Sequence, residues 1–293
     1  MLERLAERAV DMRPDRTTPC SELLAALADP AIDRIGASHV AVVVAHPDDE
    51  TIACGAQLRR LDGASVIIVT DGAPRDLRDA RRIGFVAAED YAATREQELR
   101  TALAVAGVHS DRVTCLRVPD QGAALRLPQL SLALARLLAQ RRIHTVITHA
   151  FEGGHPDHDA TAFCVHAAAA LARADGHTIG LIEAPFYRLG AHGIVRQEFA
   201  GLPHAGERVL HLTVKERALK RLMMAAHRTQ RGVLAPFRIN IERFRPTPAY
   251  DFARRPNGGR VLYERYPWGL DGTRWSRLVR AARGQLRLED APC

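Results

Sequence analysis

The strongest constraint on the fold is a regular alternation of short apolar runs with longer helical stretches. The apolar runs are rich in β-branched residues and predict strands at 40–45, 65–70, 113–118, 144–148, 178–183 and 208–213. Helices are expected between them at 51–61, 85–106, 128–140, 159–174 and 214–230. Segments of these lengths in this order form βαβ units with right-handed crossovers. The sequence therefore predicts an α/β fold, with a largely parallel sheet and helices on both faces.

The alternation also divides the chain. Residues 38–230 contain all of it and are expected to form one core, which suits a chain of 293 residues. After Arg231, prolines interrupt any long helix, at Pro236, Pro246, Pro248, Pro256 and Pro267. We therefore expect residues 231–293 to form an irregular C-terminal extension packed on the core. Residues 1–37 are expected to form an N-terminal extension with one or two short helices.

The net charge of +7 raises the question of an anionic partner. Almost all of the positive charge is arginine, since Lys215 and Lys220 are the only lysines. The arginines are dispersed among acidic residues, as in 75–82, rather than gathered into a basic stripe. An excess of arginine with abundant alanine and leucine is typical of a bacterial genome rich in G and C. The charge pattern therefore does not predict nucleic-acid binding.

Composition also bears on the compartment. A hydrophobic content of 47% and a charged content of 26% are ordinary for a globular protein. No apolar stretch reaches the roughly 20 residues that span a bilayer, and the first residues are charged. Five scattered cysteines without a C-x-x-C pair indicate reduced thiols, and Cys54 is expected to be a small buried residue. We expect a cytoplasmic protein without stable membrane insertion.

Two clusters of histidine and aspartate follow two of the predicted strands. Ala45-His-Pro-Asp-Asp-Glu50 follows the first strand, and Gly154-His-Pro-Asp-His-Asp159 comes soon after the strand at 144–148. One such cluster is usually a turn with a helix cap. Two clusters at the carboxyl edge of one sheet can lie close enough to bind the same ion or small molecule. Imidazole and carboxylate groups bind zinc, and a catalytic zinc site keeps three protein ligands and an open position. We predict that His46, Asp49 and His158 bind a metal ion.

The remaining polar residues of the clusters have matching roles. Asp48, beside Asp49, is predicted to be the general base that takes a proton from metal-bound water. His155, three residues before His158, is predicted to stabilise an oxyanion as an imidazolium. Asp157 is expected to orient or charge His155.

Four further residues are candidates for substrate binding. Arg75 and Arg78 lie in a long charged connection, 72–94, and would hold a sugar hydroxyl or phosphate unless they form a solvated helical face. Glu50 opens a predicted helix and either favours the positive helix end or braces a ligand histidine. His227 lies on the last predicted helix, either near the site or as an ordinary buried histidine.

Other side chains have two interpretations each. His149 ends the strand at 144–148 and either lies in the layer behind the metal ligands or is an ordinary histidine. The aromatic side chains of the C-terminal part either stack on a sugar ring or pack in the core, and they are Tyr263, Tyr266, Trp268 and Trp275.

The two clusters resemble those of the PIG-L/LmbE family of de-N-acetylases. Further segments are similar to that family's later motifs, namely Val69-Thr-Asp-Gly72, Arg95-Glu-Gln-Glu-Leu99, Val118-Pro-Asp120, Lys215-Glu-Arg-Ala218 and His227-Arg-Thr-Gln230. The resemblance extends from about residue 38 to residue 230. It implies a Rossmann-like fold, and it implies the same roles for His46, Asp48, Asp49, His155, Asp157 and His158.

The resemblance also implies an activity. Zinc is the usual metal of the family, and other divalent ions are used as well. The implied reaction removes an acetyl group from a small-molecule conjugate of N-acetylglucosamine type. Some family members of thiol pathways carry a tyrosine just before the histidine of the second motif. Gly153 and Gly154 stand there in this chain, which argues against those pathways.

Two rival functions remain open at this point. The first is an amidase that cleaves a larger acyl group or a thiol conjugate. The second is a non-catalytic Rossmann-like module that binds a nucleotide or nucleic acid, but the first strand-to-helix turn lacks G-x-G-x-x-G. An inactive scaffold is disfavoured because every motif position is filled. The sequence leaves open the acceptor that carries the N-acetyl sugar and whether the chain forms a homo-oligomer.

Overall fold

The computed structural model describes residues 9–11, 19–201 and 206–288. Its main sheet has seven strands in the order β11-β12-β8-β7-β3-β5-β6. They are β3 (Val40–Val44), β5 (Ser65–Pro74), β6 (Val113–Asp120), β7 (Thr145–His149), β8 (Gly180–Ala184), β11 (Arg208–His211) and β12 (Ile241–Pro246). Strands β3, β5, β6, β7 and β8 run parallel to one another. Strands β12 and β11 add an antiparallel edge beside β8. The predicted α/β fold with a largely parallel sheet is confirmed.

The order of the strands creates one distinctive position. The chain starts the sheet at its centre with β3 and adds β5 and β6 on one side. It then returns to add β7 and β8 on the other side. The sheet therefore reverses its winding between β3 and β7, where open α/β sheets bind their ligands. The two histidine and aspartate clusters follow these two strands.

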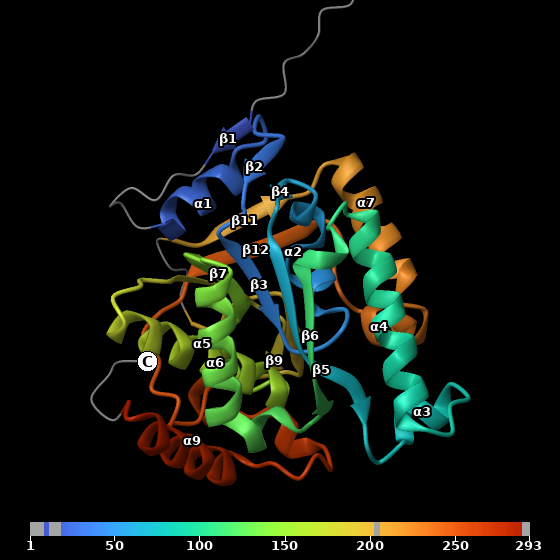
Figure 1. Cartoon of the computed structure of the whole chain (residues 1–293). Coiled ribbons are helices and arrows are strands. Elements are labelled where there is room, and N and C mark those ends of the chain that lie inside the picture. The colour runs from blue at the N-terminus through green and yellow to red at the C-terminus, as the bar shows by residue number, and fades with distance from the viewer. Residues whose placement is uncertain (1–8, 12–18, 202–205, 289–293) are drawn as a thin grey trace, which may run out of the picture.

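Helices cover both faces of this sheet (Figure 1). On one face, alternate strand residues such as Val43 and Ile67 pack against α5 (Leu127–Gln140), α6 (Pro156–Ala174) and α9 (Gly272–Leu286). On the other, Val42 and Ile68 pack against α1 (Pro19–Ala28), α2 (Asp49–Leu58), α4 (Ala88–Val105) and α7 (Val214–Ala226). β3 itself is buried along its whole length, as expected for a central parallel strand.

Several smaller elements surround this frame. They are strands β1 (Ala9–Asp11), β2 (Arg34–Gly36), β4 (Leu61–Asp62), β9 (Tyr187–Leu189) and β10 (Ile194–Arg196), helices α3 (Arg78–Arg82) and α8 (Arg231–Leu234), and 3₁₀ turns η1 (Ser110–Arg112), η2 (Ala123–Arg126), η3 (Arg228–Gln230), η4 (Asn257–Gly259) and η5 (Leu262–Arg265). β1, β2 and β4 form a small separate sheet, and β9 pairs with β10 as a hairpin. None of the described helices is long and apolar enough to cross a bilayer.

The terminal segments differ in part from expectation. The N-terminal segment contains helix α1, as expected, and also the short strands β1 and β2, while residues 1–8 and 12–18 lie outside the described part. The segment after residue 230 is irregular between η4 and α9, but β12 inserts it into the main sheet between β8 and β11. The segment 231–293 is therefore not only an irregular extension, because β12 is a strand of the main sheet and α9 packs on one of its faces.

Candidate active site

The candidate metal ligands meet at the carboxyl ends of β3 and β7. His46 and Asp49 lie on the turn between β3 and α2, and His158 lies on the first turn of α6. All three are more than nine-tenths buried. Nδ1 of His46 is 3.1 Å from Oδ2 of Asp49, Nε2 of His158 is 3.4 Å from the same oxygen, and the two nitrogens are 3.3 Å apart. The three atoms thus form a nearly equilateral triangle.

This triangle fits a divalent cation. Ligand atoms that lie about 2.0–2.2 Å from one tetrahedral zinc ion are separated from one another by about 3.3–3.6 Å. The donor set, two imidazoles and one carboxylate, is the kind that zinc binds. The geometry and the chemistry of His46, Asp49 and His158 are therefore suited to such an ion.

Two further histidines lie in the same cluster, but hydrogen bonds already use one nitrogen of each. Nε2 of His149 is 3.5 Å from Oδ2 of Asp49, yet it accepts a hydrogen bond from the backbone N–H of Ala45 at 2.8 Å. Its ring stacks on that of His158 at 4.1 Å, so it packs behind that ligand as expected. Nδ1 of His155 accepts from the backbone N–H of Asp157 at 3.1 Å.

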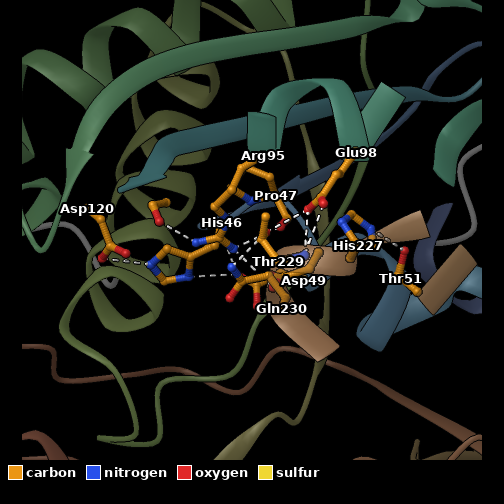
Figure 2. Close-up of polar contacts among 12 residues, drawn as sticks. His46, Pro47, Asp49, Thr51, Arg95, Glu98, Asp120, His227, Thr229 and Gln230 are labelled. Carbon is orange, nitrogen blue, oxygen red and sulfur yellow. Dashed lines mark hydrogen bonds and ion pairs between the residues drawn. The ribbon is translucent and has the colours of Figure 1, made fainter. Parts of the chain in front are cut away.

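The other nitrogen of His46 faces two carboxylates. Its Nε2 lies 3.3 Å from Oδ1 of Asp120 and 3.4 Å from Oδ2 of Asp157 (Figure 2 shows the contact with Asp120). Carboxylates in this position orient a metal-binding histidine and make it a better ligand. Asp120 ends β6, two positions across the sheet from β3, and was not predicted as a site residue. Its place after a parallel strand was the signal in the sequence.

The position of Asp157 differs from the prediction. Its carboxylate accepts the backbone N–H groups of Gln121, at 2.6 Å, and Ala123, at 3.0 Å, and it faces His46 rather than His155. Only its backbone N–H reaches the ring of His155. Asp157 is fixed in this way because it lies in the first turn of α6, beside the loop that follows β6. It therefore supports a candidate metal ligand and the wall of the site.

His155 also differs from the predicted imidazolium. It caps α6, and because its Nδ1 accepts a hydrogen bond, its proton is on Nε2. Burial holds the pKa of His155 well below its ordinary value. The side chain is a neutral imidazole whose Nε2–H is available as a donor.

Asp48 has a strained backbone and forms an ion pair with Arg95. Its φ of 141° is unusual for a residue other than glycine, and such strain concentrates at functional sites. Its Oδ2 is 3.0 Å from Nη2 of Arg95 on α4, and its backbone N–H donates to Oε2 of Glu50 at 3.0 Å. Burial raises the pKa of Asp48 to about 7, although the guanidinium of Arg95 acts to lower it. A carboxylate of this pKa is suited to general-base catalysis.

Arg95 is held in place by backbone atoms as well. Its guanidinium donates to the carbonyl of Pro47 at 2.9 Å and to the carbonyl of Gly72. Gly72 has a φ of 65°, and a Cβ there would lie 2.3 Å from Nη1 of Arg95. This close approach requires glycine at the end of β5. Arg95 was noted in the sequence only as part of a family motif, without a role.

The predicted substrate residues lie outside the cavity. Glu50 and His227 are buried behind the site, where Nε2 of His227 is 3.3 Å from Oε1 of Glu50. Arg75 is occupied by Asp71 and by the carbonyl of Ala73. Arg78 is paired with Asp76 on the surface. None of these four lines the pocket.

The pocket above the triangle has a volume of about 420 Å³. Its floor is polar and includes the candidate metal ligands, Asp48, Arg95, Asp120 and His155. Further lining residues, which we call the mouth, come from other parts of the chain: Asp79, Arg82, Tyr187, Ile194, Arg196, Gln230, Val233, Phe237, Leu262, Tyr266 and Trp268. The C-terminal aromatics divide accordingly, because Tyr263 and Trp275 are buried in the core while Tyr266 and Trp268 line the pocket.

Tyr187 lines the pocket and contacts a candidate metal ligand. Its ring packs 5.3 Å from that of His158, and its hydroxyl makes no hydrogen bond to another described residue. Burial and the charges of Asp49 and Asp120 raise the pKa of Tyr187 well above its ordinary value, so the hydroxyl keeps its proton. Gly154 allows this packing, because a Cβ there would lie 2.0 Å from the carbonyl oxygen of Tyr187.

Comparison with known proteins agrees with this arrangement. Residues 41–169 match the family model for PIG-L, described as GlcNAc-PI de-N-acetylase. This stretch includes every residue of the triangle as well as Asp48 and His155. A comparison with curated protein sequences finds no match.

Solved structures share the fold at low sequence identity. The A40926 pseudoaglycone deacetylase Dbv21 is 22% identical with a TM-score of 0.54, covering 71% of this chain and 96% of its own. The zinc-inhibited form of teicoplanin deacetylase Orf2 is 17% identical with a TM-score of 0.54, covering 72% and 98%. The N,N′-diacetylchitobiose deacetylase from Pyrococcus horikoshii is 20% identical with a TM-score of 0.50, covering 71% and 83%.

Proposed function

We propose, on the premise that the core of this chain at residues 41–169 belongs to the PIG-L family, that it hydrolyses the acetamide of an N-acetylated amino-sugar conjugate. His46, Asp49 and His158 would hold a divalent cation, with zinc as the first choice. The observation that carries the proposal is the triangle of their ligand atoms, 3.1–3.4 Å on each side, next to the buried carboxylate of Asp48. The deacetylase activities of the structural neighbours support the same reaction class.

The cation would supply Lewis acidity, which polarises the amide carbonyl and lowers the pKa of a water molecule. The carboxylate of Asp48 accepts a proton from the attacking water as the water oxygen bonds to the carbonyl carbon. Arg95 and the strained backbone hold this carboxylate toward the pocket. Asp48 then gives the proton to the amine nitrogen as the C–N bond breaks, which releases acetate and the free amino sugar.

Two neutral donors are available for the oxyanion. Nε2–H of His155 and the hydroxyl of Tyr187 belong to side chains that line the same pocket. Both groups are neutral, so neither would bind the acetate that the reaction releases as tightly as a cation would. Donors fixed in advance around a developing negative charge lower the barrier of acyl-transfer reactions. We assign both residues to this role.

The test is acetate release from a panel of N-acetylglucosamine conjugates by protein that is first depleted of metal and then given zinc, manganese, cobalt or magnesium. Acetate release that depends on one of these ions is expected. A panel that yields longer carboxylic acids but no acetate would favour the amidase with a larger acyl group. A protein that binds no divalent ion and releases no acid would favour the non-catalytic binding module instead.

A further inference from the structure

Three exposed apolar side chains converge on the mouth of the pocket. Ile194, Val233 and Tyr266 all line it, with 38%, 49% and 41% of their surface exposed. They come from three separate elements: β10, α8 and the segment just after η5. Scattered single apolar residues are normal on a protein surface, but several that converge on one cavity mark a binding surface.

An aromatic surface connects this mouth to the reacting groups. The ring of Trp268 lies 4.6 Å from that of His155, and Tyr266 stacks on Trp268 at 4.4 Å with an interplanar angle of 13°. A group that is bonded to the reacting amide at the floor therefore meets Trp268 first and Tyr266 next. Phe237 and Leu262 also line the pocket.

Two of the charged side chains at the mouth neutralise each other. Arg82 is paired with Asp79 at 3.2 Å. Arg196 has no ion pair or hydrogen bond through its side chain among the residues that the structure describes, which leaves one free cation beside the apolar side chains. The balance of this surface is apolar, with one basic group at its edge.

We propose that the mouth is a subsite for an apolar acceptor, so that the substrate is an N-acetylated amino sugar bonded to an aryl or alkyl group. The acceptor would pack on Tyr266 and against Ile194 and Val233, while the amino sugar lies over Trp268. This inference rests on the proposed function and specifies its substrate class. It assigns recognition of the acceptor to residues that lie outside the matched stretch 41–169.

The first experiment compares acetate release from four substrates that share the reacting group: free N-acetylglucosamine, N,N′-diacetylchitobiose, and the phenyl and octyl β-glycosides of N-acetylglucosamine. Burial of an aryl or alkyl group at the mouth is expected to raise kcat/KM by about 10-fold or more over free N-acetylglucosamine. The ratio between the glycosides and the free sugar should fall to about 3-fold or less in Tyr266→Ala and in Val233→Ser. The matched control is Leu222→Ser, an exposed apolar residue of α7 outside the pocket, and it should keep the wild-type ratio.

A binding experiment gives a readout that does not need turnover. The chain has only two tryptophans, and Trp275 is fully buried in the core whereas Trp268 lines the pocket. Titration with phenyl β-glucosaminide, which lacks the acetyl group, should change the intrinsic fluorescence at about 10-fold lower concentration than glucosamine does. The change should disappear in Trp268→Phe, with folding checked by thermal unfolding.

The outcomes separate the two proposals. Acetate release that is equal or better with diacetylchitobiose overturns the apolar subsite and leaves the proposed function intact. No acetate from any substrate, with tighter binding of the phenyl compound, keeps the apolar subsite and overturns the proposed reaction. Selective turnover of an N-acetylglucosamine 1-phosphate ester that is lost in Arg196→Gln also overturns the apolar subsite, because the acceptor would then be anionic.

Discussion

The floor and the mouth of the pocket are built on different physical principles. Floor residues such as Asp48 and His158 are buried, and strand ends, helix starts and backbone hydrogen bonds fix them. Mouth residues such as Val233 and Tyr266 are exposed and apolar, and they come from segments after residue 186. The family model covers the candidate metal ligands, Asp48 and His155 of the floor, but none of the apolar residues at the mouth. This difference matches our two proposals, which assign the chemistry to the floor and the choice of acceptor to the mouth.

The largest expected effect is on the floor. His158→Ala removes one corner of the ligand triangle, and we expect metal affinity to fall by more than about 100-fold. Elemental analysis of the purified variant should then find well under one ion per chain. His109→Ala, at an exposed histidine just before η1 and outside the pocket, is the matched control and should keep full occupancy. Full occupancy in His158→Ala would contradict the ligand assignment.

Removal of the base should separate metal binding from turnover. Asp48→Asn keeps the size of the side chain but loses its ability to take a proton, so kcat should fall by about 10³-fold. Metal content should stay at the wild-type level, because Asp48 is not a corner of the triangle. Asp251→Asn, at an exposed carboxylate, serves as the control for the same chemical change. An Asp48→Asn variant with near-normal kcat would refute the assignment of the base.

Gly72→Ala tests how tightly the floor is packed. The new Cβ would collide with Nη1 of Arg95 and also adopt a φ of 65°, so we expect a loss of about 2–3 kcal/mol in the free energy of unfolding and at least a 10-fold loss of activity. Gly107→Ala has a similar φ, 81°, but open space around its Cβ. It should cost about 1 kcal/mol and leave activity unchanged. Equal effects of the two substitutions on activity would show that Arg95 is not held as described.

The smallest predicted effect concerns the donor that bridges floor and mouth. Tyr187→Phe keeps the ring that packs on His158 but removes the hydroxyl, so kcat should fall by about 10-fold while KM changes little. Tyr263→Phe is the matched control, since its buried hydroxyl also lacks a partner but faces the core. Steady-state kinetics should show no change there. A rise in KM at constant kcat in Tyr187→Phe would assign the hydroxyl to substrate binding only.

The floor was largely predictable from the sequence, because its residues lie in two short clusters that follow parallel strands. The side chains that contact these residues were less predictable. Asp120 and Arg95 reach the site from β6 and α4, and only the three-dimensional arrangement brings them to His46 and Asp48. Glu50 and His227 carry charge in the sequence but satisfy each other behind the site.

The mouth and the strand β12 could not be predicted, because both depend on contacts between residues that are distant in the chain. The segment Ile241–Pro246 contains two charged residues at buried positions, which argues against a strand in a sheet. In the structure, Glu242 pairs with Lys220 at 2.8 Å and Arg245 pairs with Glu183 at 2.6 Å. These partners are distant in the chain, so the local pattern carries no sign of them. The same holds for Ile194, Val233 and Tyr266, which become one surface only after folding.

The most direct test of the central claim is a titration of metal-depleted protein with zinc, in which bound ion by elemental analysis and acetate release are measured on the same samples. We predict that acetate release rises in proportion to occupancy and saturates at one ion per chain. The Asp48→Asn variant should bind the same amount of ion and release almost no acetate. Acetate release at full rate from protein without a divalent ion would contradict the account.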